Sequence, residues 1–277
     1  MNNSKNSILL VDPEFDPNTA SDCNLLLKIT GDSFSYAIID KNTRQLKAVF
    51  DQQECEDMST ELAAILKNDS YLNLPFKEIK VSVYTPNTIA VPNDFFCKQD
   101  LNAYANFFSE DQSDTLYTRG FSRFGFTSVF NLEKFSAQAL NTFLASAARY
   151  EQNAPVLALA TSVKETSLLL DFTAGSFNAL LLEEGKMRFQ NTYQMENSEE
   201  FNYYLVLLIQ QLKLDLATIP VLISGIIHQN DEFHTCLHKY FNHINFNLPP
   251  ANDVDHAILD DMPAHYYSSL LALDLCV

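Results

Sequence analysis

The chain is poor in glycine, with only 6 glycines among its 277 residues. A loop that wraps a phosphate usually needs several glycines of its own, because only glycine lets the backbone approach a ligand so closely. The few glycines and 10 prolines also leave no room for a long flexible linker. The composition therefore disfavours both a glycine-rich nucleotide loop and two domains on a long tether.

Basic residues are also scarce. The 18 lysines and arginines face 35 aspartates and glutamates, which gives a formal net charge of −17. A surface this acidic repels the phosphates of nucleic acids and anionic lipids, so we expect no nucleic-acid partner. Arg119 and Arg123 in the segment RGFSRFGF are the best basic candidates. Two arginines do not form a binding stripe, and alternating aromatic residues there favour a surface hairpin.

The sequence contains no membrane span or signal peptide that we recognise. The apolar run near the N-terminus has four residues, and Asp171 and Asn178 interrupt the longest apolar segment. The five cysteines are odd in number and too far apart for a CxxC motif, which indicates reduced thiols. We therefore expect a cytoplasmic protein without direct membrane insertion. The cysteines are Cys23, Cys55, Cys97, Cys236 and Cys276.

Two long segments repeat each other. Residues 24–40, NLLLKITGDSFSYAIID, align with residues 167–183, SLLLDFTAGSFNALLLE, at an offset of 143 positions. The alignment matches three leucines, a threonine, a serine and a phenylalanine. A later pair, Ile79 and Ile219, aligns at an offset of 140. Two matches at nearly one offset indicate an internal duplication.

Each copy predicts the element order β-β-β-α-β. A strand-turn-strand hairpin is followed by a third strand, an amphipathic helix and a final strand. In the first copy these segments are residues 24–40, 44–52, 55–68 and 78–86; in the second they are 167–183, 186–194, 198–214 and 218–226. Hairpins followed by a crossover helix predict a mixed sheet of the α/β class.

Further elements surround each copy. We predict helices over residues 100–111, 131–151, 231–244 and 264–275, two strands within 114–130, and a short strand over 244–248. Polar residues and Pro155 near YEQNAPV mark the predicted boundary, which gives one half over residues 1–152 and another over 153–277. A cleft between two such halves is a common place for ligands to bind.

This arrangement resembles the actin-like ATPase superfamily, which includes actin, Hsp70 and sugar kinases. The resemblance implies an α/β fold with two tandem ribonuclease H-like halves. Residues 187–246 are further similar to a bacterial family of unknown function with this fold and about this length. That match includes an asparagine in the third strand, the helix start EEFNYY and a single glycine ending the next strand.

In active members of the superfamily, two hairpin turns bracket the phosphates. Each turn begins with an aspartate that acts through a bound cation, and continues with glycines and Ser or Thr. In the first turn of this chain, Lys28 stands where the aspartate is expected, and Gly31 is its one glycine. Asp32 follows, and its charge would be directed at a phosphate.

The second turn keeps more of the pattern. Asp171 is present, but Ala174 stands at a position where glycine is common. The superfamily's adenosine-binding turn, a Gly-Gly pair, is reduced here to Ser224-Gly225, followed by the bulky Ile226. The resemblance implies the following vestigial phosphate and adenosine contacts: Lys28, Thr30, Gly31, Ser33, Asp171, Thr173, Gly175, Ser176, Ser224 and Gly225.

Three interpretations of the hairpins remain open. They are inherited structure that binds no nucleotide, a nucleotide site without efficient hydrolysis, or the site of a working ATPase or kinase. We favour the first, with no cofactor and no catalytic residue; the alternative is ATP bound through Mg²⁺ on Asp171. A small-molecule kinase needs a catalytic base near the end of a first-half strand, and none is identified. His234 and His238 have a spacing that zinc accepts but lack a third ligand, so we expect no metal site.

The sequence therefore predicts a non-catalytic protein with an actin-like fold and a degenerate nucleotide site. Related scaffolds in bacterial pilus and division machinery bind short peptides of membrane partners. By that resemblance we expect an unknown protein or peptide partner. Edge strands near RGFSRFGF are able to pair between chains, so both a monomer and a dimer are consistent with the sequence.

Overall fold

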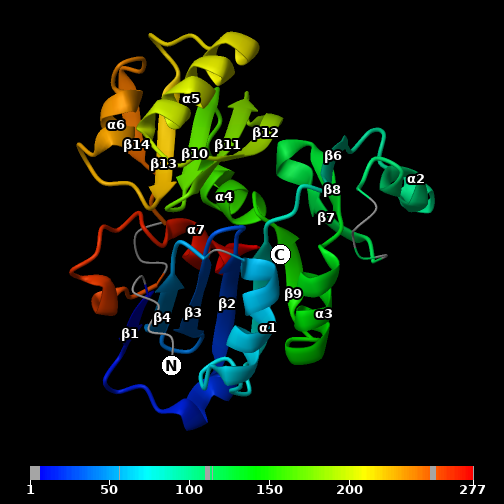
Figure 1. The fold of residues 1–277 in the computed structure, drawn as a ribbon, viewed down its shortest axis with the longest axis vertical. Helices are drawn as coiled ribbons and strands as arrows, with labels where there is room; N and C mark the ends of the chain where they lie inside the picture. Colours follow the sequence, from blue (N-terminus) through cyan, green and yellow to red (C-terminus); the bar gives the residue numbers. More distant parts are fainter. Residues whose placement is uncertain (1–6, 56, 110–112, 114, 250–253, 277) are drawn as a thin grey trace.

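The computed structural model describes residues 7–55, 57–109, 113, 115–249 and 254–276. Two mixed sheets form its framework, and a small three-stranded sheet lies beside them (Figure 1). The larger sheet uses strands that precede residue 152, and the five-stranded sheet uses strands from residues 167–246. The α/β class predicted from the sequence is confirmed.

The six-stranded sheet has the order β1-β4-β3-β2-β5-β9. Strands β1 to β4 pair in antiparallel fashion, and β5 and β9 continue the sheet in parallel with β2. Helices α1 and α3 pack against each other and share an apolar core with this sheet. The elements are β1 (Ser7–Val11), β2 (Cys23–Ile29), β3 (Phe34–Asp40), β4 (Leu46–Gln52), α1 (Met58–Asn68), β5 (Glu78–Val83), α3 (Lys134–Phe143) and β9 (Ala148–Glu151).

The five-stranded sheet repeats this plan in the order β12-β11-β10-β13-β14. Asn197 caps helix α5 by accepting hydrogen bonds from the backbone N–H groups of Glu199 and Glu200. The elements are β10 (Ser167–Phe172), β11 (Ser176–Glu183), β12 (Lys186–Gln194), α5 (Ser198–Leu212), β13 (Pro220–Gly225), α6 (Glu232–Leu237) and β14 (His243–Phe246). The predicted β-β-β-α-β order is therefore confirmed in both copies.

The duplication extends to single hydrogen bonds. In the first copy the Tyr84 N–H donates to the Ile29 carbonyl oxygen over 2.8 Å, and in the second the Ile226 N–H donates to that of Phe172 over 2.9 Å. Both bonds hold the end of the fourth strand against the end of the first strand. The two hairpins therefore meet their parallel neighbours in the same way.

The small sheet has the order β6-β8-β7. Its strands are β6 (Thr88–Pro92), β7 (Tyr117–Phe121) and β8 (Phe126–Phe130). The two strands predicted within residues 114–130 are confirmed, whereas β6 was not predicted. The helix expected over 100–111 is reduced to α2 (Leu101–Ala105) after a 3₁₀ turn, and residues 110 and 111 lie outside the described residues.

Two further helix predictions were also too long. The helix expected over 131–151 ends at Phe143, and Ala148–Glu151 forms strand β9 instead. Tyr150 and Glu151 are buried, so a strand enclosed on both faces shows no alternating pattern in the sequence. Similarly, the helix expected over 231–244 ends at Leu237, because the next residues lead into β14, which pairs in parallel with β13.

The C-terminal segment returns to the first sheet. The helix expected over 264–275 consists of α7 (Ser268–Leu271) and a 3₁₀ turn (Ala272–Leu275), and these pack with α4 (Ala154–Leu159). Leu270 and Leu273 share a buried cluster with Leu26 of β2. Figure 1 shows α7 where the two sheets meet. The predicted boundary between the two halves, at residues 152 and 153, stays a prediction. The C-terminal segment belongs to the second half in the sequence but packs against the sheet of the first half.

No helix among the described residues combines the length and apolar character needed to cross a bilayer.

Gly225 allows β13 to lie close to the end of β10, and its replacement tests that packing. Its φ is +85°, and an added Cβ would lie 2.0 Å from the Phe172 carbonyl oxygen. We expect Gly225→Ala to lower the free energy of unfolding by about 3 kcal/mol or more, measured by urea denaturation. The matched control is Gly120→Ala, where a Cβ would meet nothing within 4 Å. Equal stability of the two variants would contradict this role for Gly225.

Candidate functional site

The turns of the two hairpins contact each other where the sheets meet. Each turn is closed in the same way by a threonine and a serine three residues later. Thr30 Oγ1 lies 2.7 Å from Ser33 Oγ and accepts from the Ser33 N–H. Thr173 Oγ1 lies 2.8 Å from Ser176 Oγ and accepts from the Ser176 N–H. The predicted pair of equivalent turns therefore exists.

A buried ion pair joins the first strands of the two hairpins. Lys28 Nζ on β2 lies 2.6 Å from Asp171 Oδ2 on β10, with side chains that are 9% and 0% exposed. Lys28 also donates to Ser269 Oγ over 2.7 Å, and Ser224 Oγ donates to Asp171 Oδ1 over 2.7 Å. These additional bonds offset the desolvation of the two charges. Both carboxylate oxygens of Asp171 thus have a protein partner.

Asp32 places a carboxylate in the second turn. Its Oδ2 accepts from Thr173 Oγ1 over 2.7 Å and from the Gly175 N–H over 2.8 Å, while Oδ1 accepts from Thr30 Oγ1. A hydroxyl and a backbone N–H in a tight turn are donors that suit a phosphate oxygen. The charge of Asp32, expected at the phosphate position, lies within hydrogen-bond distance of those donors.

Gly175 leaves room for this contact, and a larger residue there would make the Asp32 carboxylate shift. A Cβ on Gly175 would lie 2.8 Å from Asp32 Oδ2. Gln53 supports the same turn from the first half, since its Oε1 accepts from the Ala174 N–H over 3.2 Å. The turn that keeps most of the phosphate-binding pattern is therefore bonded by the other half of the chain.

The predicted adenosine turn is also engaged by the protein. The Gly225 N–H donates to the His265 carbonyl oxygen, and the Ile226 N–H donates to that of Phe172, each over 2.9 Å. Ser224 is bonded to Asp171, as described above. The polar groups of this turn thus stabilise the join between β13, β10 and the C-terminal segment.

The structure brings the ten predicted residues together at one place in the fold. Lys28, Asp171 and Ser224 form one hydrogen-bonded network. Around Asp32 and its contacts lie Thr30, Ser33, Thr173, Gly175 and Ser176. Gly31 lines the cavity beside these turns, and Gly225 packs on Phe172. A cofactor-binding role for the ten residues stays a prediction.

A cavity of about 440 Å³ lies beside the two turns. Its charged lining residues, Asp32, Glu196 and Glu200, are all acidic, and the rings of Tyr84 and Tyr204 also line it. Because like charges repel, this lining is unfavourable for the phosphates of a nucleotide.

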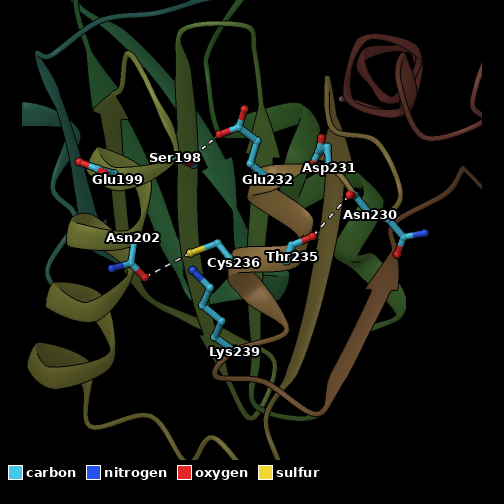
Figure 2. A pocket seen from close by; sticks show the side chains of 9 residues that line it. All are labelled: Ser198, Glu199, Asn202, Asn230, Asp231, Glu232, Thr235, Cys236 and Lys239. Atoms are coloured by element: carbon cyan, nitrogen blue, oxygen red, sulfur yellow. Dashed lines mark hydrogen bonds between the residues drawn. The ribbon is translucent and has the colours of Figure 1, made fainter.

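A second hollow lies between α5 and α6 (Figure 2). Its side chains bond to each other: Cys236 Sγ donates to Asn202 Oδ1 over 3.2 Å, and Ser198 Oγ donates to Glu232 Oε2 over 2.6 Å. The nearby His234 is buried and accepts from the Asn230 N–H. Within the described part of the chain, no three His, Cys, Asp or Glu residues are placed to hold a metal ion.

Glu151 is a buried acid that the sequence analysis missed. It ends β9, a first-half strand, where a catalytic base was sought, and its position was hidden because residues 131–151 were interpreted as a helix. The side chain is fully buried, and Oε2 accepts from the N–H and the side-chain amide of Asn153. Burial raises the pKa of Glu151 to about 7, against these two hydrogen bonds, which lower it.

Glu151 makes stability depend on pH. Its pKa is raised from 4.5 in the unfolded chain to about 7 in the folded protein. Between these two pH values the folded state therefore holds a proton that the unfolded state has released. Its contribution to stability is therefore present below about pH 4.5 and is lost as the pH rises through 7. Relative to wild type, Glu151→Gln should gain roughly 2–3 kcal/mol in free energy of unfolding between pH 5 and pH 8.

Urea denaturation at the two pH values measures this change. The exposed Glu165→Gln variant controls for the loss of one carboxylate. A stability difference between Glu151→Gln and wild type that is the same at pH 5 and pH 8 would contradict the prediction.

The Lys28–Asp171 pair should couple strongly in a double-mutant cycle. Lys28→Met leaves a buried carboxylate without its cation, and we expect a loss of about 3–5 kcal/mol in the free energy of unfolding. Lys28→Met/Asp171→Asn should recover much of that loss, because no unpaired charge remains.

The exposed Arg188–Glu183 pair, at 2.5 Å, is the matched control for this cycle. Its side chains are 64% and 48% exposed, so its coupling should be below about 1 kcal/mol. Similar coupling energies for the two pairs would contradict the assigned importance of the buried one.

Solved structures with the same arrangement have an actin-like ATPase fold. A Bacteroides thetaiotaomicron protein of unknown function, described as having that fold, superposes with a TM-score of 0.71 at 15% identity, covering 88% of this chain and 98% of its own. The PilM–PilN type IV pilus biogenesis complex gives a TM-score of 0.61 at 14% identity, covering 91% of this chain and 97% of that chain. These likenesses confirm the predicted fold.

The family comparison agrees with the predicted resemblance. No curated protein sequence matches the chain significantly. The family described as "Protein of unknown function (DUF3822)" matches residues 12–244, which is most of the chain. The chain belongs to the DUF3822 family.

Proposed function

We propose that this protein is a non-catalytic scaffold that binds a protein or peptide partner and does so without nucleotide. The observation that carries the proposal is the pair of charges between the hairpins. Lys28 lies where a cation would sit against Asp171, and Asp32 lies against the donors of the second turn. The chain's own side chains thus bond to the groups that the resemblance assigns to a cation and a phosphate.

The energetic cost of displacing these groups supports the proposal. A nucleotide with Mg²⁺ would have to separate Lys28 from Asp171, and breaking a buried pair costs about 3–5 kcal/mol. A ligand with a dissociation constant of 1 mM gains only about 4 kcal/mol of binding free energy in total. The acidic lining of the adjacent cavity adds repulsion. The degenerate nucleotide site predicted from the sequence is therefore the interpretation we retain.

The same contacts favour a scaffold role, because they link the two halves without a ligand. Among the proteins with this fold, PilM is found in a complex with PilN. We extend partner binding to this chain by analogy of fold, and we place it in the cytoplasm because its five cysteines are free. The acidic net charge supports the absence of a nucleic-acid partner.

Isothermal titration with ATP and ADP, with and without Mg²⁺, tests nucleotide independence. We expect no saturable heat up to millimolar nucleotide for the wild-type chain. Saturable Mg²⁺-dependent binding, lost in Asp171→Ala, would overturn the proposal and favour the alternative of an ATP-binding protein that holds Mg²⁺ on Asp171.

The Asp32→Gly variant tests whether the Asp32 carboxylate is the group that keeps phosphate out of the second turn. It removes the carboxylate from the second turn and places glycine where the duplicated sequence has Gly175. Because Thr173 Oγ1 and the Gly175 N–H lose their acceptor, inorganic phosphate should bind more tightly to this variant than to wild type. Equal phosphate affinity would contradict the assignment of Asp32 as the group that fills the turn.

A further inference from the structure

Strand β12 ends the five-stranded sheet and has one unpaired edge. Within the described residues this nine-residue strand pairs only with β11, through eight of its residues, all except Arg188. In an antiparallel ladder, alternate residues direct their N–H and C=O groups to the side away from the partner. β12 therefore offers a row of backbone donors and acceptors on its side that faces away from β11.

This edge is partly covered, because the 3₁₀ turn Ser122–Phe124 contacts β12 and Met187 packs against the cluster that contains Phe124 and Phe126. Natural proteins block free edges with charged side chains, proline or covering elements. In β12 the charged residues are Lys186 and Arg188, both near the hairpin end, and residues 189–194 carry neither charge nor proline. Arg188 is bonded to Glu183 and is mostly exposed, so it lies at the rim. The uncharged part of the edge is suited to strand addition.

Strand β6 presents a second free edge to the same groove. β6 pairs with β8 alone among the described strands. A cavity of about 510 Å³ is lined by Ile89 and Ala90 of β6 and by Gln190 and Asn191 of β12. Figure 1 shows β12 at the edge of its sheet nearest the small sheet. Two strand edges from different sheets therefore border one groove.

The charge of the groove indicates which occupant fits. Arg188, paired with Glu183, is the one charged residue among its lining residues, whereas the lining of the cavity beside the hairpin turns includes three acids. Because this one charge is already paired, the groove offers no counter-charge to a charged side chain and fits an uncharged segment. Tyr84, Ile89 and Met187 supply apolar contacts, and Asn191 supplies an exposed amide.

We propose that this β12–β6 groove binds an extended, uncharged segment of a partner protein, which adds to the edge of β12 as a further strand. The inference rests on the proposed function, since it locates the partner site of the scaffold. Backbone hydrogen bonds to β12 would supply affinity, and contacts with the side chains of β6 would select the residues of the segment.

Peptides selected from a random 12-residue phage-displayed library against the full chain provide the probe. Hydrogen exchange should show slower exchange for amides of residues 186–194 and 88–92 when a selected peptide is bound, and no change in β14. Asn191→Lys should weaken binding at least tenfold by fluorescence anisotropy. The matched control is Asn245→Lys, an exposed substitution on β14 at the opposite edge of the same sheet, which should leave affinity unchanged.

Several outcomes would overturn this inference. One is that no peptide is selected; another is that peptides bind equally to wild type and Asn191→Lys and protect other strands. A third is that the chain dimerises and Asn191→Lys alone dissociates it, which would assign the groove to a second copy. None of these results depends on nucleotide binding, so the titrations with ATP test the proposed function separately.

Discussion

The buried ion pair between Lys28 and Asp171 is the contact on which the arrangement of the two halves depends. It joins β2 to β10, and its partners Ser269 and Ser224 add the C-terminal segment and β13 to the same network. A buried charge without its counter-ion is strongly unfavourable, so these four elements are stable only in positions that keep both charges paired. One electrostatic constraint thus fixes elements that are far apart in the sequence.

The two contacts across the hairpins connect positions that the duplication makes equivalent. Lys28 bonds to Asp171, and Asp32 bonds to Gly175, and both pairs are separated by 143 residues. In the first pair the charges of Lys28 and Asp171 are opposite, and in the second pair the charged Asp32 faces an uncharged glycine. Asymmetric substitution at equivalent positions therefore turns two facing turns into complementary surfaces. A ligand placed between the turns would have to replace these contacts.

The contacts between the two hairpin turns do not cover the outer edges of the sheets. The ends of the first strands are occupied by side chains of the protein, whereas β12 and β6 each have one edge that pairs with no other strand among the described residues. The proposed scaffold function therefore places partner recognition at the edges of the sheets and not at the carboxyl ends of the strands. Main-chain hydrogen bonding at an edge requires neither a cation nor a glycine-rich turn, which is consistent with a chain that has 6 glycines.

The sequence alone determined the α/β class, the duplicated element order and the position of both turns, because hydrophobic periodicity and a repeated pattern are local properties. It did not show strand β9 or the burial of Glu151, since a fully enclosed strand has no alternating pattern. Nor did it show that Lys28 reaches Asp171, or that Asp32 enters the second turn. Those contacts join residues 143 positions apart. Only the packing of the two sheets decides whether such side chains meet.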